Sequence, residues 1–335
     1  MSSEEPKTAR LPRCSIVIRC YNEENHIGRL LEGVMHQTVR DPGIIVVDSG
    51  STDGTLDIVA RYPAQVIHVT PQEFSFGRAL NRGCTATSAE FVVVASAHVY
   101  PIYKDWLERL LAPFKDERVA LVYGKQRGDE RTKYSERQVF ATWFGDHPNP
   151  SQKHPFCNNA NAAIRRTVWG RQPYDESLTG LEDIAWGRAA MGLGYRIVYE
   201  PAAEVVHVHE ETAARLYNRY RREAIALKGI FPEERFNLWD LLRLFVGNVA
   251  SDLYHATGDG VLMRSAGSVL MFRLMQFWGT YRGFARRRPV TSGLRQTFYY
   301  PRLRARTIPD SEQSRAQHRI EYEDSHRAKG RNGGG

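Results

Sequence analysis

The chain has few of the features that mark exported or membrane-spanning proteins. Its 335 residues include only 4 cysteines, scattered without the pair spacing of a metal site, so we expect reduced thiols in place of disulfides. No apolar run approaches the ~20 residues that span a bilayer as a helix. The first twelve residues are polar and include acids, which argues against a secretory signal peptide. We therefore expect a cytoplasmic protein.

Acidic residues are also scarce toward the end of the chain. Residues 226–335 hold 18 Lys and Arg against 10 Asp and Glu, whereas residues 1–225 hold 28 of each. The stretch Arg282–Arg306 contains eight arginines and no acid. This uneven distribution predicts a neutral globular part followed by a basic part that meets an anionic surface. No recognised nucleic-acid-binding motif accompanies the arginines, so we do not expect nucleic acid as the partner.

The first part of the chain alternates short β-branched runs with helical patterns. A helical example is Ile27, Leu30, Leu31 and Val34, which recur at i, i+3, i+4 and i+7. The expected strands cover residues 15–18, 44–47, 66–69, 91–94 and 119–122. This alternation predicts an α/β fold with a mostly parallel central sheet, and such sheets bind ligands at the carboxyl ends of their strands.

From about residue 236 the pattern becomes helical, and after Thr307 the chain is polar, charged and ends in glycine. We expect a folded domain over residues 13–230, a basic helical region over 231–306 and a disordered tail over 307–335. Two amphipathic stripes define the expected helices: Leu238, Leu241, Leu242, Phe245 and Val249, and then Leu270, Leu274, Phe277 and Trp278.

Polar motifs follow the first two expected strands. Tyr21–Glu24 reads Tyr-Asn-Glu-Glu, and Asp48–Thr55 reads Asp-Ser-Gly-Ser-Thr-Asp-Gly-Thr. These elements, in this order and each placed after a strand, resemble family 2 glycosyltransferases of the GT-A fold, and the bacterial rhamnosyltransferase-like branch in particular. The resemblance covers about residues 13–230. It implies a Rossmann-like, nucleotide-sugar-binding fold and inverting transfer of a sugar from a nucleoside diphosphate-sugar, such as a UDP- or dTDP-sugar.

The resemblance implies that the loops after these strands hold the nucleotide. Asp48 would bind the base, because a carboxylate accepts a hydrogen bond from the N–H of uracil or thymine, and Tyr21 would stack on it. The alternative is that Asp48 and Asp53 are turn and cap residues. Arg78 would neutralise phosphate, or it is a solvated surface charge. The further donor-binding candidates are Arg19, Glu23, Ser96 and Asn159.

A metal site is implied after the fourth strand, where family members place aspartate. Here Ser96 and His98 occupy the matching positions. His207 and His209 alternate along a later strand and would therefore point to the same side. Imidazole ligates manganese and other transition metals but suits magnesium poorly. We expect a divalent metal, manganese in preference to magnesium, on His98, His207 and His209. The alternative is a lost metal site in which His98 only binds phosphate.

The catalytic base is implied by the run Gly180–Trp186, which matches the family's Glu-Asp motif at a helix start. Inverting transfer needs one carboxylate to take the proton of the acceptor hydroxyl. The resemblance gives that role to Asp183, with Glu182 orienting it or contacting the sugar. Both could instead be simple first-turn acids that the helix dipole favours. A following helix carries a set of arginines that either close over the donor phosphates or form a solvated face: Arg215, Arg219, Arg221 and Arg222.

The expected function is sugar transfer to a glycan or lipid-linked acceptor in bacterial surface polysaccharide synthesis. One rival is an inactive scaffold that binds a glycan or a partner, which His98 favours and the Glu182–Asp183 pair opposes. Another is a sugar nucleotidyltransferase, which needs a glycine-rich basic loop where Tyr21–Glu24 stands. The basic helical region is expected to contact an anionic membrane peripherally or to form a homo-oligomer.

Overall fold

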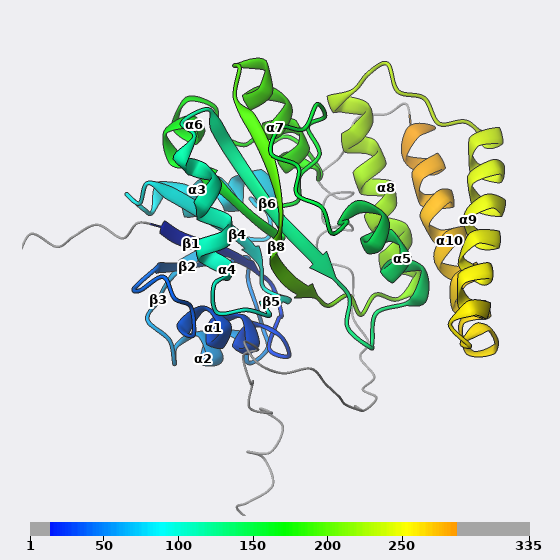
Figure 1. Ribbon diagram of the computed structural model, residues 1–335, viewed down its shortest axis with the longest axis horizontal. Helices are drawn as coiled ribbons and strands as arrows, with labels where there is room; N and C mark the ends of the chain where they lie inside the picture. The colour runs from blue at the N-terminus through cyan, green and yellow to red at the C-terminus, as the bar shows by residue number, and fades with distance from the viewer. Residues whose placement is uncertain (1–13, 287–335) are drawn as a thin grey trace, which may run out of the picture.

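The computed structural model describes residues 14–286, whose centre is an eight-stranded sheet (Figure 1). In space the strands follow the order β3-β2-β1-β4-β7-β6-β8-β5. Neighbours are parallel from β3 to β4 and between β6 and β8, whereas β7 runs antiparallel to β4 and β6, and β5 antiparallel to β8. The predicted α/β class with a mostly parallel sheet is confirmed. The strands are β1 (Cys14–Cys20), β2 (Gly43–Asp48), β3 (Ala64–His68), β4 (Phe91–Ser96), β5 (Val99–Pro101), β6 (Val119–Arg127), β7 (Asn161–Arg165) and β8 (Arg196–His207).

Helices cover both faces of this sheet, which explains why its strands read as continuous apolar runs. Ile16 and Ile18 of β1 pack on one face, with α1 (Ile27–Met35), α2 (Thr55–Val59) and α4 (Trp106–Leu111). Val17 points to the other face. There the covering helices are α3 (Phe76–Thr85), α5 (Tyr134–Trp143), α6 (Arg166–Arg171) and α7 (Glu182–Gly192), and a 3-10 turn over Ala112–Lys115 follows α4.

Three long helices stand beside the sheet (Figure 1). They are α8 (Ala213–Ile230), α9 (Leu238–Gly258) and α10 (Leu262–Phe284). α10 lies against α8 so closely that a Cβ atom at Gly279 would stand 2.6 Å from the carbonyl oxygen of Tyr217. α9 packs on the far side of α10 and completes an antiparallel hairpin with it.

α10 thus packs on α8 and α5, and α5 in turn contacts β6 of the sheet. No helix within residues 14–286 has the length and apolar content needed to cross a bilayer. The division into a domain over 13–230 and a helical region over 231–306 stays a prediction. The expected tail over 307–335 and most of the stretch Arg282–Arg306 lie outside the described residues.

The side chain of Asn161 links four elements at the carboxyl end of the sheet. Its Oδ1 accepts a hydrogen bond of 2.8 Å from Nε1 of Trp106. Its Nδ2 donates to the carbonyl oxygens of Lys125 at 3.1 Å and Ala203 at 2.8 Å. Asn161 is fully buried, so these bonds satisfy groups that water cannot reach.

Replacing Asn161 with alanine should lower the free energy of unfolding by about 3 kcal/mol, because three buried polar groups lose their partner. Urea denaturation would measure the change. Asn248→Ala is the matched control, since the Asn248 amide donates only within α9, to Leu244, and should change stability by less than about 0.5 kcal/mol. Equal effects of the two substitutions would contradict a structural role for Asn161.

Candidate active site

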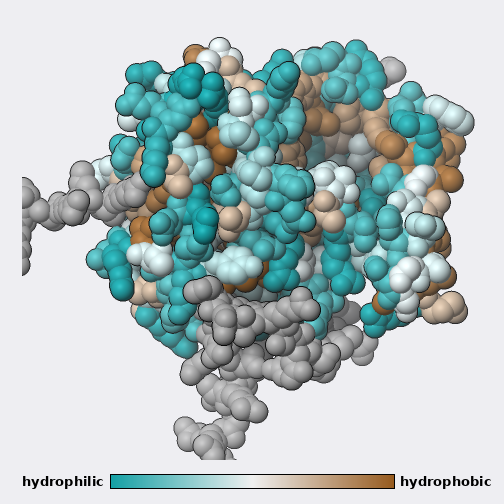
Figure 2. Space-filling view, viewed as in Figure 1, coloured by the Kyte–Doolittle hydropathy of each residue, from teal (hydrophilic) through white to brown (hydrophobic). Residues whose placement is uncertain are grey.

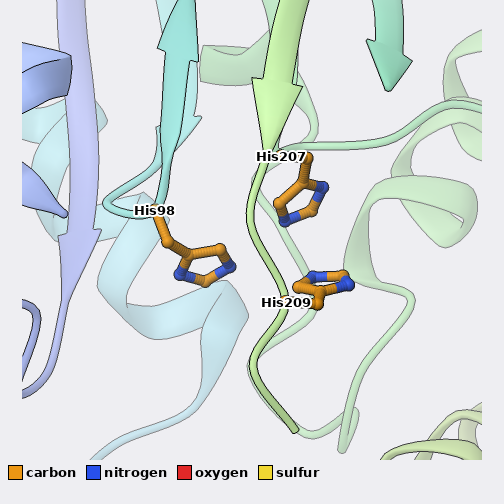
Figure 3. Close-up of side chains that lie close together, drawn as sticks. All are labelled: His98, His207 and His209. Carbon is orange, nitrogen blue, oxygen red and sulfur yellow. The ribbon is translucent and has the colours of Figure 1, made fainter. Parts of the chain in front are cut away.

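Three histidines meet where β4 and β8 end (Figure 3). β5 pairs with β8 so that Val99 lies opposite His207, and the backbone N–H of Val208 donates to the carbonyl oxygen of His98 at 3.0 Å. The ring centroids are 5.0 Å apart for His98 and His207, 5.6 Å for His98 and His209, and 4.0 Å for His207 and His209. One ring nitrogen from each lies within 4.8 Å of the others. The sequence prediction that these three residues form one cluster agrees with this placement.

An acceptor oxygen from a separate element lies at Nδ1 of each ring, and Nη1 of Arg219 also lies 3.0 Å from Nδ1 of His209. The pairs are Glu23 Oε1 with His98 at 2.8 Å, Gln126 Oε1 with His207 at 2.7 Å, and Glu136 Oε1 with His209 at 2.6 Å. With Nδ1 engaged in all three rings, Nε2 is the nitrogen left for a ligand. Nε2 of His207 is buried and has no hydrogen-bond partner in the described part of the chain. Ligating histidines in proteins are held in this way, so the residues fit a divalent transition metal.

A second group of possible ligands shares His209 with the first and adds Glu136 and Glu211. The guanidinium of Arg219 already occupies it, with Nη2 at 2.6 Å from Glu136 and Nε at 3.0 Å from Glu211. An arginine cation and a metal would repel each other there. The three-histidine group is therefore the better candidate metal centre.

Burial and the neighbouring charges set the protonation of these rings. Burial lowers the pKa of His207 well below its usual value, and His209 and His98 lower it further. The ring of His207 is therefore neutral, as a metal ligand must be. Burial also lowers the pKa of His98, but the carboxylate of Glu23 outweighs it and the net shift is upward. A metal on His98 would compete with a proton.

The acid pair Glu182–Asp183 begins α7 and is buried against the end of β1. Nη1 of Arg19 donates to Glu182 Oε1 at 2.9 Å. The backbone N–H of Asn159 donates to Asp183 Oδ2 at 3.0 Å, and the Asn159 amide lies 3.4 Å from Glu182. The structure thus joins four of the predicted residues, from three separate segments of the chain, in one cluster.

Asp183 is 9% exposed. Burial and the adjacent carboxylate of Glu182 raise its pKa to about 7, despite the opposing hydrogen bond from Asn159. Leu181, just before the pair, has φ of 54°, in the left-handed region that costs a non-glycine residue about 1 kcal/mol. Such strain is found where the surrounding structure fixes a functional conformation.

Two arginines stack on one phenylalanine beside the acid pair. The guanidinium carbons of Arg19 and Arg222 lie 4.6 Å and 4.7 Å from the ring centroid of Phe76. Nε of each is buried without a hydrogen-bond partner among the described residues. Arg222 is thus packed against α3, and Arg219 is buried in its ion pairs. Of the two alternatives for these arginines, a solvated face is therefore wrong for Arg219 and Arg222.

The nucleotide candidates lie at the ends of β1 and β2. Asp48 pairs in register with Cys20, the residue before Tyr21. Its carboxylate accepts from the backbone N–H groups of Gly50 at 3.0 Å and Ser51 at 3.2 Å. These bonds are those of a turn residue, as one of the two sequence interpretations predicts. Binding of a base by Asp48 and Tyr21 stays a prediction.

Two further candidates contact neither cluster directly. Arg78 of α3 pairs with Glu176 at 2.6 Å and donates to the carbonyl oxygen of Glu73. Ser96 ends β4, two residues before His98, and its N–H lies 3.4 Å from the carbonyl oxygen of Ala160. Phosphate binding by either residue stays a prediction.

Sequence reasoning missed Gln126 and Glu136. They lie 81 and 73 residues from the histidines that they hold, and neither belongs to a recognisable motif. Glu23, a donor-binding candidate from the sequence, contacts His98, and its binding of the donor stays a prediction. No signal in a single sequence could have paired these residues, because the contacts depend on how β6 and α5 pack beside β8.

The ion pair of Arg19 and Glu182 should be strongly coupled to stability. Arg19→Met leaves a buried carboxylate without its cation and should lower the free energy of unfolding by about 3 kcal/mol. In a Glu182→Gln background the same change should cost about 1 kcal/mol or less. Urea denaturation of the four proteins of this cycle gives the coupling energy, and a value near zero would contradict the interpretation of the pair.

Comparisons with known proteins agree with these observations. The model of the glycosyl transferase family 2 matches residues 15–172. The O-antigen chain rhamnosyltransferase WbaN of Salmonella anatum is 27% identical over 222 residues, which cover 63% of this chain and 70% of that protein. RfbN of Salmonella typhimurium, which has the same description, is 23% identical over 221 residues, which cover 62% and 70%.

The fold agrees as well. The mannosyltransferase PcManGT from Pyrobaculum calidifontis, solved in complex with GDP-Man and Mn²⁺, superposes with a TM-score of 0.56 at 18% identity, covering 87% of this chain and 88% of that one. At this identity the likeness shows a shared fold alone. Taken together, the matched domain, the relatives and the fold show a glycosyltransferase with the GT-A fold, whose residues 15–172 match the glycosyl transferase family 2.

Proposed function

We propose that this enzyme transfers a sugar, with inversion, from a nucleoside diphosphate-sugar such as a UDP- or dTDP-sugar to a glycan or lipid-linked acceptor in bacterial surface polysaccharide synthesis. The observation that carries the proposal is Asp183, a buried carboxylate with a pKa near neutrality at the start of α7. The curated relatives WbaN and RfbN, which are O-antigen chain rhamnosyltransferases, support the polysaccharide context.

Asp183 is the proposed general base. Two backbone N–H groups, of Asn159 and Ile184, fix the orientation of its carboxylate. As the acceptor oxygen bonds to the anomeric carbon, the bond from that carbon to the diphosphate oxygen breaks and the hydroxyl proton passes to Asp183. Attack from the face opposite the diphosphate inverts the configuration. Glu182 is held by Arg19 and is the proposed contact for the sugar.

Nε2 of His98, His207 and His209 is proposed to hold a divalent cation, manganese in preference to magnesium. The unpartnered Nε2 of His207 supports this, as does the nitrogen-rich set of ligands. When bound, such a cation offsets the charge that develops on the departing diphosphate. The inactive scaffold is the weaker alternative because the acid pair is held in an ordered arrangement with Asn159.

The donor's base is proposed to lie at the adjoining ends of β1 and β2, on Tyr21 and Asp48. The diphosphate and sugar would then extend toward the two clusters. The further residues proposed along this path are Arg19, Glu23, Arg78, Ser96 and Asn159. The domain over 13–230 would form this whole site, and a lipid-linked acceptor would bring the enzyme to a membrane surface.

Sugar transfer should depend on ionised Asp183. The purified protein, given a panel of UDP-, dTDP- and GDP-sugars with candidate acceptors, should consume at least one donor and form a product of inverted anomeric configuration, which NMR would show. Because the base must be deprotonated, kcat should rise as pH increases through about 7. Asp183→Asn should lower kcat by about 100-fold or more while donor binding persists.

Asp175→Asn is a matched control, because Asp175 is an exposed aspartate whose carboxylate caps the turn at Ser177. It should keep nearly full activity. Retention of anomeric configuration, or wild-type turnover by Asp183→Asn, would contradict the proposed mechanism. A protein that neither binds nor consumes any donor would overturn the function itself.

The histidine site should bind metal without nucleotide. Mn²⁺ titrations followed by electron paramagnetic resonance should show one site. Competition with Mg²⁺ should show that its affinity for Mn²⁺ is at least about tenfold higher than its affinity for Mg²⁺. Gln126→Leu should weaken Mn²⁺ binding by about 10- to 100-fold, because His207 loses the oxygen that fixes its ring. His255→Ala, which changes an exposed histidine of α9, should leave the affinity unchanged. Equal Mn²⁺ affinity in wild type and His98→Ala would refute the site.

A further inference from the structure

The hairpin of α9 and α10 exposes an unusual amount of apolar surface. Among residues 14–286, nine of the thirteen large apolar side chains that are exposed belong to these two helices. Figure 2 shows hydrophobic residues gathered at the right-hand edge, where Figure 1 places the hairpin. A concentration of this kind marks an interaction surface, because scattered exposed residues would be spread over the whole molecule. The nine are Leu238, Trp239, Leu242, Val246, Tyr254, Met263, Leu270, Leu274 and Trp278.

The inner side of α10 is already occupied. Phe272 is fully buried against α5 and α8, and Gly279 lies against the backbone of α8. Leu270, Leu274 and Trp278 recur every four residues, so they share one side of the same helix, and their exposure of 47%, 45% and 38% shows that neither α8 nor α9 covers that side. The apolar surface is therefore an outer face, and intramolecular packing between the described helices does not require it.

The acids of the hairpin are engaged within the protein. Asp252 accepts two hydrogen bonds of 2.8 Å from the guanidinium of Arg273. Asp259 accepts from the hydroxyl of Tyr134 at 2.7 Å. Asp240 closes the capping box at the start of α9. None of the three carboxylates is thus free to offset a cation on the outer face.

The arginines of the hairpin border the apolar face. Arg243 has a side chain that is 61% exposed, and its ion pair within α9 spans 3.9 Å. Arg264 and Arg282 are also exposed, and the guanidinium of Arg282 lies 5.7 Å from the ring centroid of Trp278. In the sequence, residues 287–306 directly after α10 add six arginines and no acid. An apolar face with cationic borders complements a surface that has an apolar interior and anionic groups on its outside.

We propose that the outer face of the α9–α10 hairpin docks on an anionic lipid bilayer, with its apolar side chains among the headgroups and its arginines at the lipid phosphates. Amphipathic helices with tryptophan and basic borders bind bilayer interfaces in this way. A second copy of the chain fits less well. A two-fold dimer would place this face against itself and set its arginines against one another.

The docked hairpin would also be coupled mechanically to the active site. Its inner side packs on α5 and α8, the helices that carry Glu136 and Arg219. The enzyme would thus sit on the membrane with its histidine cluster held by the helices that touch the hairpin. The docking does not depend on which donor or acceptor the enzyme uses, so its test is independent of the proposed reaction.

Vesicle flotation of the full-length protein tests the docking. The protein should float with vesicles of equimolar phosphatidylcholine and phosphatidylglycerol and not with phosphatidylcholine alone, and high salt should release it. The double variant Leu242→Ser/Val246→Ser should have an affinity for the anionic vesicles that is lower by about tenfold or more. The control Met35→Ser/Leu193→Ser should bind as wild type, because its exposed fractions of 53% and 57% match the 48% and 63% of Leu242 and Val246. Circular dichroism and urea denaturation would show that both variants are folded.

Three outcomes would overturn the proposal. The first is no flotation with anionic vesicles, and the second is equal flotation with neutral ones. The third is wild-type flotation by Leu242→Ser/Val246→Ser. If light scattering showed a wild-type dimer that this variant dissociates, without flotation, the face would bind a second copy in place of a membrane.

Discussion

The antiparallel pairing of β5 with β8 is the contact on which the candidate metal centre depends. β5 is only three residues long, yet it fixes His98, which follows β4, beside His207 at the end of β8. The two histidines are 109 residues apart in the sequence, and this pairing is what brings them together. The acceptors at Nδ1 come from three further parts of the chain, namely the loop after β1, strand β6 and helix α5. The centre thus exists only when the whole carboxyl edge of the sheet is assembled.

Burial plays opposite parts at the two clusters of the site. It lowers the pKa of His207, so that the ring is neutral and able to ligate, and raises that of Asp183, so that the carboxylate can take a proton near neutral pH. Arg19 joins the acid pair to Phe76, on which Arg222 of α8 also stacks. Because α8 in turn packs along α10, the helical region and the catalytic edge share one continuous set of contacts. Packed helices therefore connect the outer face of the hairpin to the acid pair Glu182–Asp183.

Much of the fold could be predicted from local signals in the sequence. The β-branched runs around Ile16 and Ile45 predicted buried parallel strands, since only strands covered on both faces read as continuous apolar segments. The resemblance to family 2 implied the roles of His98 and Asp183, through the motifs in which the two residues stand. The partners of these residues could not be predicted. Gln126, Glu136 and the Arg19–Glu182 pair join distant segments through side-chain packing, and a single sequence carries no record of such contacts.

We propose that the Nε2 atoms of three histidines hold a metal at the donor's diphosphate while Asp183 acts as the base on the acceptor. Anomalous diffraction from crystals grown with Mn²⁺ and a nucleoside diphosphate-sugar that the enzyme binds would test it most directly. The account predicts one strong anomalous peak within coordinating distance of Nε2 of His98, His207 and His209. It also predicts an acceptor-sized opening at Asp183 on the side of the sugar opposite the diphosphate. A peak on other ligands, or a donor bound with Asp183 on the diphosphate side, would contradict the account.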